Sequence, residues 1–318
     1  MTDFLIRIYT DIENKNPFLS KIKFYGFQRF IIRRLANFLI PLKYKLDNSC
    51  SHCLANDGND QLIVSLTTFP ARINKIWLVI ECMLRQTHKP DKIILWLSKE
   101  QFGSLEILPK RLLKLRDRGL EIVLCEGDIR SHKKYYYTLK KYPISAFITV
   151  DDDFFYPSNM IEELFSEHQK HPKDICFLRG HMMTTQNGKV ESYNSWTKEI
   201  KESTTSSLVF FTSGGGTLFP PNSLHPEATN EKVFMEICKL ADDVWLNAMS
   251  KLNGTNLNKI SSQFASQIPI SIAQNISLSS QNVDEDLNDV QINAVRNYYL
   301  KTLNKDIFDN VTANHNTK

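Results

Sequence analysis

Three consecutive carboxylates, Asp151, Asp152 and Asp153, are the residues of this 318-residue chain best placed to do chemistry. They follow residues 144–150, a run of apolar β-branched and aromatic side chains that predicts a short buried strand. Ligands bind at the C-terminal ends of strands in open α/β sheets. Adjacent carboxylates repel one another unless a cation lies among them. One explanation is Mg²⁺ or Mn²⁺ held by one or two of these residues and by substrate phosphates; the alternative is a solvated acidic turn before the next helix.

Two further clusters have residue types suited to a site. Gly214, Gly215 and Gly216 follow an apolar strand, and consecutive glycines cost conformational entropy, so one explanation is a close approach of the backbone to a neighbouring group. The alternative is a flexible hairpin tip. Asp242 and Asp243 begin a predicted helix, where Asp is also an ordinary helix-capping residue.

An alternation of strands and helices is expected to position these residues. Strands are predicted at 62–67, 92–97, 120–125 and 144–150, with helices at 74–86, 109–118 and 131–141 between them. This pattern predicts βαβ units with right-handed crossovers and a parallel sheet. The C-terminal ends of the strands then meet at one edge, which gathers Thr67, Phe69, Asp128 and the aspartate triplet. Beyond the triplet, a helix at 159–171, a strand at 175–178 and a polar stretch at 184–206 are expected.

Charge and cysteine content limit the class of protein. The net charge is +4, but residues 1–46 carry nine Lys/Arg against three Asp/Glu, which leaves the remainder slightly acidic. A nucleic-acid-binding surface over the main body is therefore not expected. Six irregularly spaced cysteines are typical of a reducing compartment, and one Cys50-x-x-Cys53 pair is too few ligands for zinc. Without a signal peptide or an apolar run of about 20 residues, the protein is expected to be cytoplasmic or peripheral to a membrane.

Residues 20–42 form a basic amphipathic segment. Five apolar residues recur at helical spacing, so they share one face: Phe24, Phe27, Ile31, Leu35 and Phe38. Arg29 and Arg33 lie on the other side of the predicted helix. Such a helix suits an anionic membrane interface; alternatively, it packs on the core of the protein itself.

Several motifs together resemble the bacterial GT-A glycosyltransferases, most closely the family-2-like enzymes of capsule and lipopolysaccharide synthesis. The motifs are residues 64–72 (VSLTTFPAR), 86–97 (QTHKPDKIILWL), 149–153 (TVDDD), 213–221 (SGGGTLFPP) and 241–245 (ADDVW). The likeness covers roughly residues 60–300. It implies an α/β, Rossmann-like GT-A fold, a mostly parallel sheet with flanking helices. The first 46 residues lie outside the likeness, and their own pattern adds an N-terminal amphipathic helical extension. We expect an extension and linker at 1–58, the GT-A domain at 59–304 and a polar tail at 305–318.

The resemblance implies transfer of a sugar, with Mn²⁺ or Mg²⁺, from a nucleotide-sugar donor, most simply a UDP-sugar, to a glycan or lipid-linked acceptor. It assigns the metal to Asp151 and Asp153, with Asp153 as the direct ligand and Asp151 nearer the ribose or a metal-bound water. It places the donor against these residues and against Asp152, Thr67, Phe69 and Arg72.

The same resemblance gives roles to residues further along the chain. Asp128 would accept a base N–H, and Lys134 either reaches the diphosphate or is a solvated helix lysine. The loop at Gly214, Gly215 and Gly216 would approach the donor sugar or the acceptor. Asp243, or alternatively Asp242, would be the base that deprotonates the acceptor. This pair is Asp-Asp rather than the Glu-Asp common in inverting relatives, so both stereochemical outcomes stay open.

Two other functions use the same features. A nucleotidyltransferase also holds metal with carboxylates on an α/β sheet, although no glycine-rich phosphate loop with a basic signature follows the first strand. A catalytically inert protein of the same fold would instead bind or scaffold glycans. Metal dependence of nucleotide-sugar binding separates these possibilities.

Overall fold

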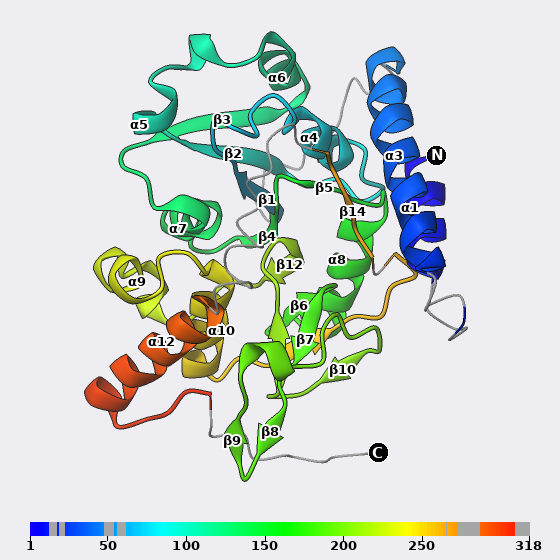
Figure 1. Ribbon diagram of the computed structural model, residues 1–318. Coiled ribbons are helices and arrows are strands. Elements are labelled where there is room, and N and C mark those ends of the chain that lie inside the picture. Colours follow the sequence, from blue (N-terminus) through cyan, green and yellow to red (C-terminus); the bar gives the residue numbers. More distant parts are fainter. Residues whose placement is uncertain are drawn as a thin grey trace.

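An eight-stranded β-sheet forms the centre of the protein (Figure 1). The computed structural model describes residues 1–12, 18, 23–47, 54–55, 62–264, 266–271 and 287–308. The strand order is β10-β13-β6-β12-β4-β1-β2-β3. The strands are β1 (Leu62–Thr67), β2 (Lys92–Ser98), β3 (Leu120–Cys125), β4 (Ala146–Val150), β6 (Ile175–Phe177), β10 (Thr204–Thr205), β12 (Gly215–Phe219) and β13 (Leu257–Lys259).

Strands β1 to β4 form the parallel half of the sheet, in the order β3-β2-β1-β4. Three of them have the predicted bounds within one residue, because strands covered on both faces read as continuous apolar runs. Strand β4 begins two residues later than predicted, at Ala146, since Ile144 is 86% exposed.

Strand β12 runs antiparallel to both of its neighbours, β4 and β6. Gly215 and Gly216 lie inside this buried strand, so the flexible hairpin tip considered from the sequence is wrong. Because β12 is reversed, it begins at the edge of the sheet where β4 ends. The backbone N–H of Asp151 accordingly donates to the carbonyl oxygen of Gly214, 3.2 Å away. This reversal brings residues 63 positions apart to one edge.

Helices cover both faces of the sheet and bury two hydrophobic clusters. One face carries α4 (Trp77–Leu84), α6 (Lys110–Lys114), α8 (Met160–Lys170) and two N-terminal helices, α1 (Thr2–Asp11) and α3 (Phe24–Leu46). The other carries α7 (Lys133–Lys141), α9 (Glu231–Ile237), α10 (Asp242–Asn253) and α12 (Leu287–Leu303). Short elements complete the chain: α5 (Lys99–Phe102), β5 (Phe154–Phe155), β7 (Gly180–Met182), β8 (Thr185–Gln186), β9 (Lys189–Val190), β11 (Val209–Phe211) and β14 (Ile268–Pro269).

The N-terminal helices share the core of the main body. Ile6 of α1 and Ala36, Ile40 and Tyr44 of α3 belong to the cluster that also contains β1 and α4. This packing does not use the predicted apolar face of α3, whose five residues are all exposed. The alternative expected for this segment, that the helix packs on the protein's own core, is therefore confirmed, but the buried side carries Ala36, Ile40 and Tyr44 rather than the predicted apolar face.

The expected fold class, an α/β protein with a mostly parallel sheet and flanking helices, is confirmed. No helix among the described residues is long and apolar enough to cross a bilayer. The Cys50–Cys53 pair, most of the linker before β1 and residues 309–318 of the predicted tail lie outside the described residues.

Candidate active site

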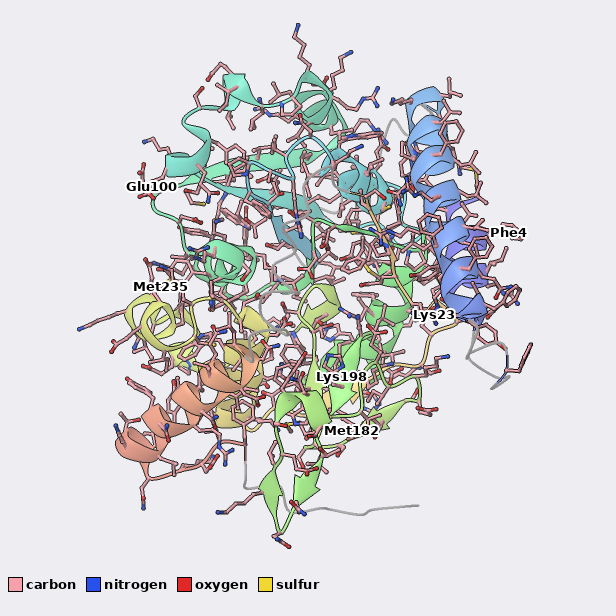
Figure 2. All side chains as sticks on the ribbon, viewed as in Figure 1. Phe4, Lys23, Glu100, Met182, Lys198 and Met235 are labelled. Atoms are coloured by element: carbon pink, nitrogen blue, oxygen red, sulfur yellow. The ribbon has the colours of Figure 1, made fainter. Side chains whose placement is uncertain are left out.

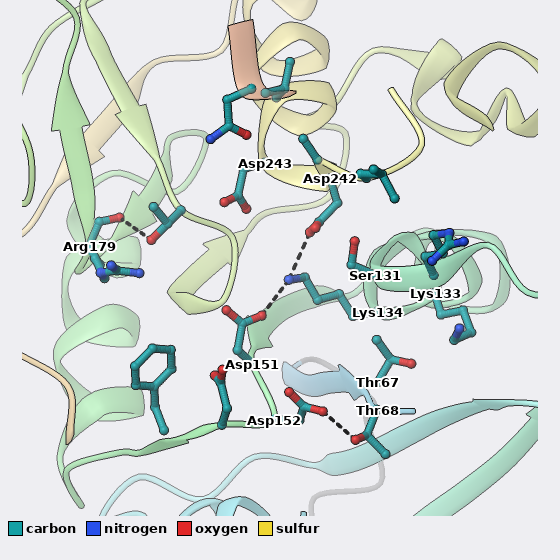
Figure 3. Close-up of a pocket in the computed structure, with 18 of the residues that line it drawn as sticks. Thr67, Thr68, Ser131, Lys133, Lys134, Asp151, Asp152, Arg179, Asp242 and Asp243 are labelled. Atoms are coloured by element: carbon teal, nitrogen blue, oxygen red, sulfur yellow. Dashed lines mark hydrogen bonds and ion pairs between the residues drawn. The ribbon is translucent and has the colours of Figure 1, made fainter. Parts of the chain in front are cut away.

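A pocket of about 750 Å³ opens where β4 ends and α10 begins (Figure 3). This volume is within the range of roughly 300–1,000 Å³ that is typical of small-molecule sites. Ten of the residues singled out in the sequence line it: Thr67, Phe69, Arg72, Asp128, Lys134, Asp151, Asp152, Asp153, Asp242 and Asp243. The parallel edge of the sheet and the N-terminus of α10 thus contribute to one cavity.

Lys134 joins the two acidic groups of the pocket. Its ammonium lies 2.8 Å from Oδ1 of Asp151 and 2.9 Å from Oδ2 of Asp242, and the residue is only 3% exposed. Burial alone would lower the pKa of Lys134, but the two carboxylates more than offset this and raise it. The alternative of a solvated helix lysine is therefore wrong, because Lys134 is a buried cation that ties β4 to α10.

Asp152 anchors the loop that follows β1. Its carboxylate accepts hydrogen bonds from Thr68 Oγ1 and from Arg72 Nη1, both at 2.5 Å. The guanidinium of Arg72 also lies over the ring of Phe69, 5.2 Å from its centroid. Burial raises the pKa of Asp152, although the charge of Arg72 opposes the shift. The predicted nucleotide-binding loop is thereby fastened to the aspartate triplet.

Asp153 keeps one buried oxygen without a partner. Its Oδ2 pairs with Arg72 Nη1 at 2.9 Å, whereas Oδ1 is buried and accepts no hydrogen bond from the described residues. Burial and the charges of Asp151 and Asp152 raise the pKa of Asp153 to about 7. An unsatisfied buried acceptor costs free energy that a bound cation would recover.

The carboxylate oxygens of the pocket suit a hard divalent cation whose coordination shell is completed by a bound ligand. Within the described ranges, no group of three or more His, Cys, Asp and Glu side chains is arranged to hold a metal ion. Mg²⁺ and Mn²⁺ at phosphate sites, however, take one or two carboxylates and complete their shell with phosphate oxygens. The free oxygen of Asp153 and the partly exposed carboxylate of Asp151 suit that kind of site.

The glycines make room for pocket residues rather than lining the pocket themselves. A Cβ on Gly214 would lie 1.8 Å from Cγ of Asp151, and one on Gly215 would lie 2.5 Å from Cβ of Arg179. Gly216 has a φ of +91°, which favours glycine. The close backbone approach inferred from the sequence is thus present, with Asp151 and Arg179 as the neighbours. A contact between this loop and a sugar stays a prediction.

Asp242 and Asp243 differ sharply in their environments. Asp242 accepts from Ser213 Oγ at 2.6 Å and pairs with Lys134, which outweighs burial and lowers its pKa to about 2. Asp243 accepts the Ser213 N–H at 2.7 Å, and burial together with the charge of Asp242 raises its pKa to about 6. Neither residue caps α10, whose N-cap is Ala241. Simple helix capping therefore does not explain the pair.

Two other predicted residues bond to the protein at the pocket edge. Asp128 accepts from Lys133 Nζ, from Gln101 at 2.7 Å and from the Arg130 N–H at 3.0 Å, and Thr67 Oγ1 donates to the carbonyl of Trp96. His225, a histidine in the turn before Pro226, lies outside the pocket, and its Nδ1 accepts from the Glu227 N–H.

One wall of the pocket was not predicted from the sequence. It contains Arg179, whose Nη2 lies 2.6 Å from Glu199 Oε1, and Lys198, whose ammonium lies 3.2 Å from the ring centroid of Tyr193. Burial lowers the pKa of Lys198 to about 8. Tyr193 and Lys198 come from the stretch at 184–206 that was described only as polar. The aromatic residues of this stretch were the feature of the sequence that could have indicated its part in the pocket.

Replacing Gly214 with alanine should destabilise the protein. The added Cβ would overlap the carboxylate of Asp151, so the backbone or that side chain must move. We expect Gly214→Ala to lose roughly 1–3 kcal/mol of unfolding free energy, as overpacked sites do, measured by urea denaturation. Gly26→Ala is the control, because a Cβ there meets nothing within 4 Å. Equal stabilities of Gly214→Ala and wild type would contradict this geometry.

Lys134→Met should leave two carboxylates without their shared cation. Removing one partner of a buried ion pair costs about 3–5 kcal/mol. Because Asp242 is the more buried of the two carboxylates, we expect the double variant Lys134→Met/Asp242→Asn to recover part of this loss. A double-mutant cycle by urea denaturation measures the coupling. Strictly additive effects would show that the two side chains do not interact.

Asp153→Asn should make the metal-free protein more stable at pH 8. The folded-state pKa is raised to about 7, above an unfolded value of about 3.9. Wild-type stability therefore falls as pH rises from about 4 to 7, and the asparagine variant avoids this cost. Thermal melts across pH test the difference, with the exposed Asp117→Asn as control. The same variant should also lose any stabilisation that Mn²⁺ gives to the wild type. If Mn²⁺ still raises the melting temperature of Asp153→Asn, then Asp153 is not a ligand of the metal.

Comparisons with known proteins give a structural likeness and no sequence match. No protein-family model matches the chain, and no curated protein matches it. Among solved structures, it is similar to the crystal structure of S. aureus TarS residues 1–349 in complex with UDP, with a TM-score of 0.43 and 12% identity. The match covers 64% of this chain and 58% of that chain.

Proposed function

We propose that this protein transfers a sugar from a nucleotide-sugar donor, most simply a UDP-sugar, to a glycan or lipid-linked acceptor, with Mn²⁺ or Mg²⁺. One observation carries the proposal. A single pocket contains two carboxylates that suit a cation, Asp151 and Asp153, and on the other side of Lys134 it contains Asp243, whose pKa is raised to about 6. Glycosyl transfer needs charge neutralisation on the leaving diphosphate and a base for the acceptor, and these two groups match those needs.

The donor side lies at the end of β4. Asp153, through its unpartnered oxygen, and Asp151 would hold the cation together with the phosphates of the donor. When bound, the cation supplies Lewis acidity to the leaving diphosphate. Thr67 and Phe69 line the same side on the loop that Asp152 fastens, which suits them to contact the nucleoside. The roles of these residues follow from their positions around one cavity.

Asp243 is the better of the two candidate bases. Its Oδ1 receives the Ser213 N–H, and Oδ2 makes no hydrogen bond to the described residues. A pKa raised to about 6 is close to the working pH of most enzymes, which favours proton transfer. Asp242, by contrast, stays ionised and bound to Lys134. Two carboxylates with separated pKa values commonly divide such roles.

The unpredicted wall suits the acceptor. Tyr193 and Phe210 offer apolar ring surface, and Arg179, Glu199 and Lys198 offer charged groups. A mixture of aromatic surface and a few polar groups is typical of sites that orient a polar ligand.

We place the reaction in surface polysaccharide synthesis, such as that of capsule or lipopolysaccharide, on the cytoplasmic side of the membrane.

Asp243→Asn should abolish most transfer while keeping donor binding. Loss of a general base lowers kcat roughly 10²–10⁴-fold, whereas the Kd for the donor should change little. Isothermal titration of a panel of nucleotide sugars, with and without Mn²⁺, identifies the donor and the metal requirement. Wild-type kcat should rise with pH through about 6, as Asp243 loses its proton.

Asp117→Asn is the matched control, because Asp117 is exposed and does not line this pocket. It should transfer sugar at the wild-type rate. Absence of binding to every nucleotide sugar, with metal present, would overturn the proposed function. Metal-independent binding of a glycan alone would instead favour the inert scaffold.

A further inference from the structure

Helix α3 presents a continuous apolar face to solvent. The exposed residues step by three or four positions, so they follow one side of the 23-residue helix: Phe24, Phe27, Ile31, Leu35, Phe38 and Leu42. Phe27 is 58% exposed and Phe38 is 69% exposed. Contiguous exposed apolar surface of this kind marks an interaction site in a soluble domain.

The opposite side of α3 is already fixed to the protein. Ala36, Ile40 and Tyr44 are buried in the core. Asn37 donates to the carbonyl of Pro269 at 2.9 Å and accepts the Ser271 N–H at 2.6 Å. The helix therefore cannot turn its apolar face inward without losing these contacts. Among the described residues, nothing covers that face.

Helix α1 extends this surface. It packs beside α3, and Arg29 of α3 donates to the carbonyl of Ile12 at 2.8 Å. Phe4 of α1 is 64% exposed and projects from the outer side of the helix pair (Figure 2). We call the solvent-facing side of α1 and α3, with Phe4 and the apolar residues of α3, the helix-pair face.

The charge of α3 indicates which kind of partner binds this face. The helix contains three arginines and two lysines and no acidic residue. Arg33, Arg34 and Lys45 are exposed along it. A second copy docked by twofold symmetry would bring two sets of these cations together around the apolar face, and like charges repel. An anionic bilayer surface matches both properties, since it accepts apolar side chains and attracts the flanking cations.

We propose that the helix-pair face docks the protein on an anionic membrane surface. Helix α3, about 34 Å long at 1.5 Å per residue, lies in the interfacial plane with its phenylalanines in the headgroup region. The exposed Arg34 and Lys45, which flank the apolar face, lie against lipid phosphates. The body of the protein stays on the water side, held by Asn37 and the buried residues of α3. This docking is independent of sugar transfer.

Vesicle flotation of the full-length protein tests the proposal. Wild type should float with phosphatidylcholine–phosphatidylglycerol vesicles and stay unbound with phosphatidylcholine alone. Phe27→Gln/Phe38→Gln should weaken binding roughly tenfold or more, since both side chains lose apolar insertion. Arg34→Gln/Lys45→Gln should weaken it in anionic vesicles and reduce its salt dependence.

Each variant has a matched control away from the helix-pair face. Ile107 and Ile144 are 67% and 86% exposed, so Ile107→Gln/Ile144→Gln removes similar apolar surface elsewhere. Lys114→Gln/Lys301→Gln removes two exposed charges elsewhere. Both controls should float like wild type.

Three results would overturn the proposal. Wild type fails to float with anionic vesicles, or the controls lose as much binding as the helix-pair variants. The third is a lipid-free dimer that Phe27→Gln/Phe38→Gln converts to monomer in light scattering, which would assign the face to a second copy. Urea denaturation confirms that each variant is folded. None of these measurements uses a nucleotide sugar, so failure here leaves the proposed function intact, and the reverse also holds.

Discussion

The ammonium of Lys134, buried between Asp151 and Asp242, is the interaction on which the site depends. Asp151 directly follows a strand of the parallel half, and Asp242 begins a helix some ninety residues later in the chain. Taking three charges out of water is costly, and only their close pairing compensates for that cost. This pairing therefore fixes the end of β4 relative to the N-terminus of α10, at the site where we propose that the chemistry occurs.

The aspartates around this cation differ in pKa because their surroundings differ. Asp242, paired with Lys134, has a pKa lowered to about 2, whereas its neighbour Asp243 has one raised to about 6. Asp153, crowded by two carboxylates, reaches about 7. The site thus contains a permanent anion, a group that can exchange protons and a group that gains from a cation. This separation of roles supports a reaction in which charge and protons move in different parts of one cavity.

The sequence predicted the parallel half well, because β1, β2 and β3 are continuous apolar runs whose length and flanking residues define them. It also placed six of the pocket residues, namely Thr67, Phe69, Asp128 and the aspartate triplet, at one edge, and the resemblance named four more. It did not predict the reversal of β12, since periodicity carries no information on strand direction. It also did not predict the pairing of Lys134 with two carboxylates, because a lysine on an isolated helix is normally solvated. Arg179 and Tyr193 come from a region of two- and three-residue strands and turns, where tertiary contacts rather than local pattern determine the structure.

The late position of β12 in the chain has a consequence for biosynthesis. Strand β4 pairs with β1 on one side and with β12 on the other, and β12 leaves the ribosome some 65 residues after β4. Domains fold progressively as the chain is made. Until residues 215–219 emerge, a nascent sheet would present β4 as an open, apolar edge, which is the kind of surface that pairs with other chains. Fast translation or chaperone capture over this interval would protect the chain, and truncation before residue 215 would leave an aggregation-prone fragment.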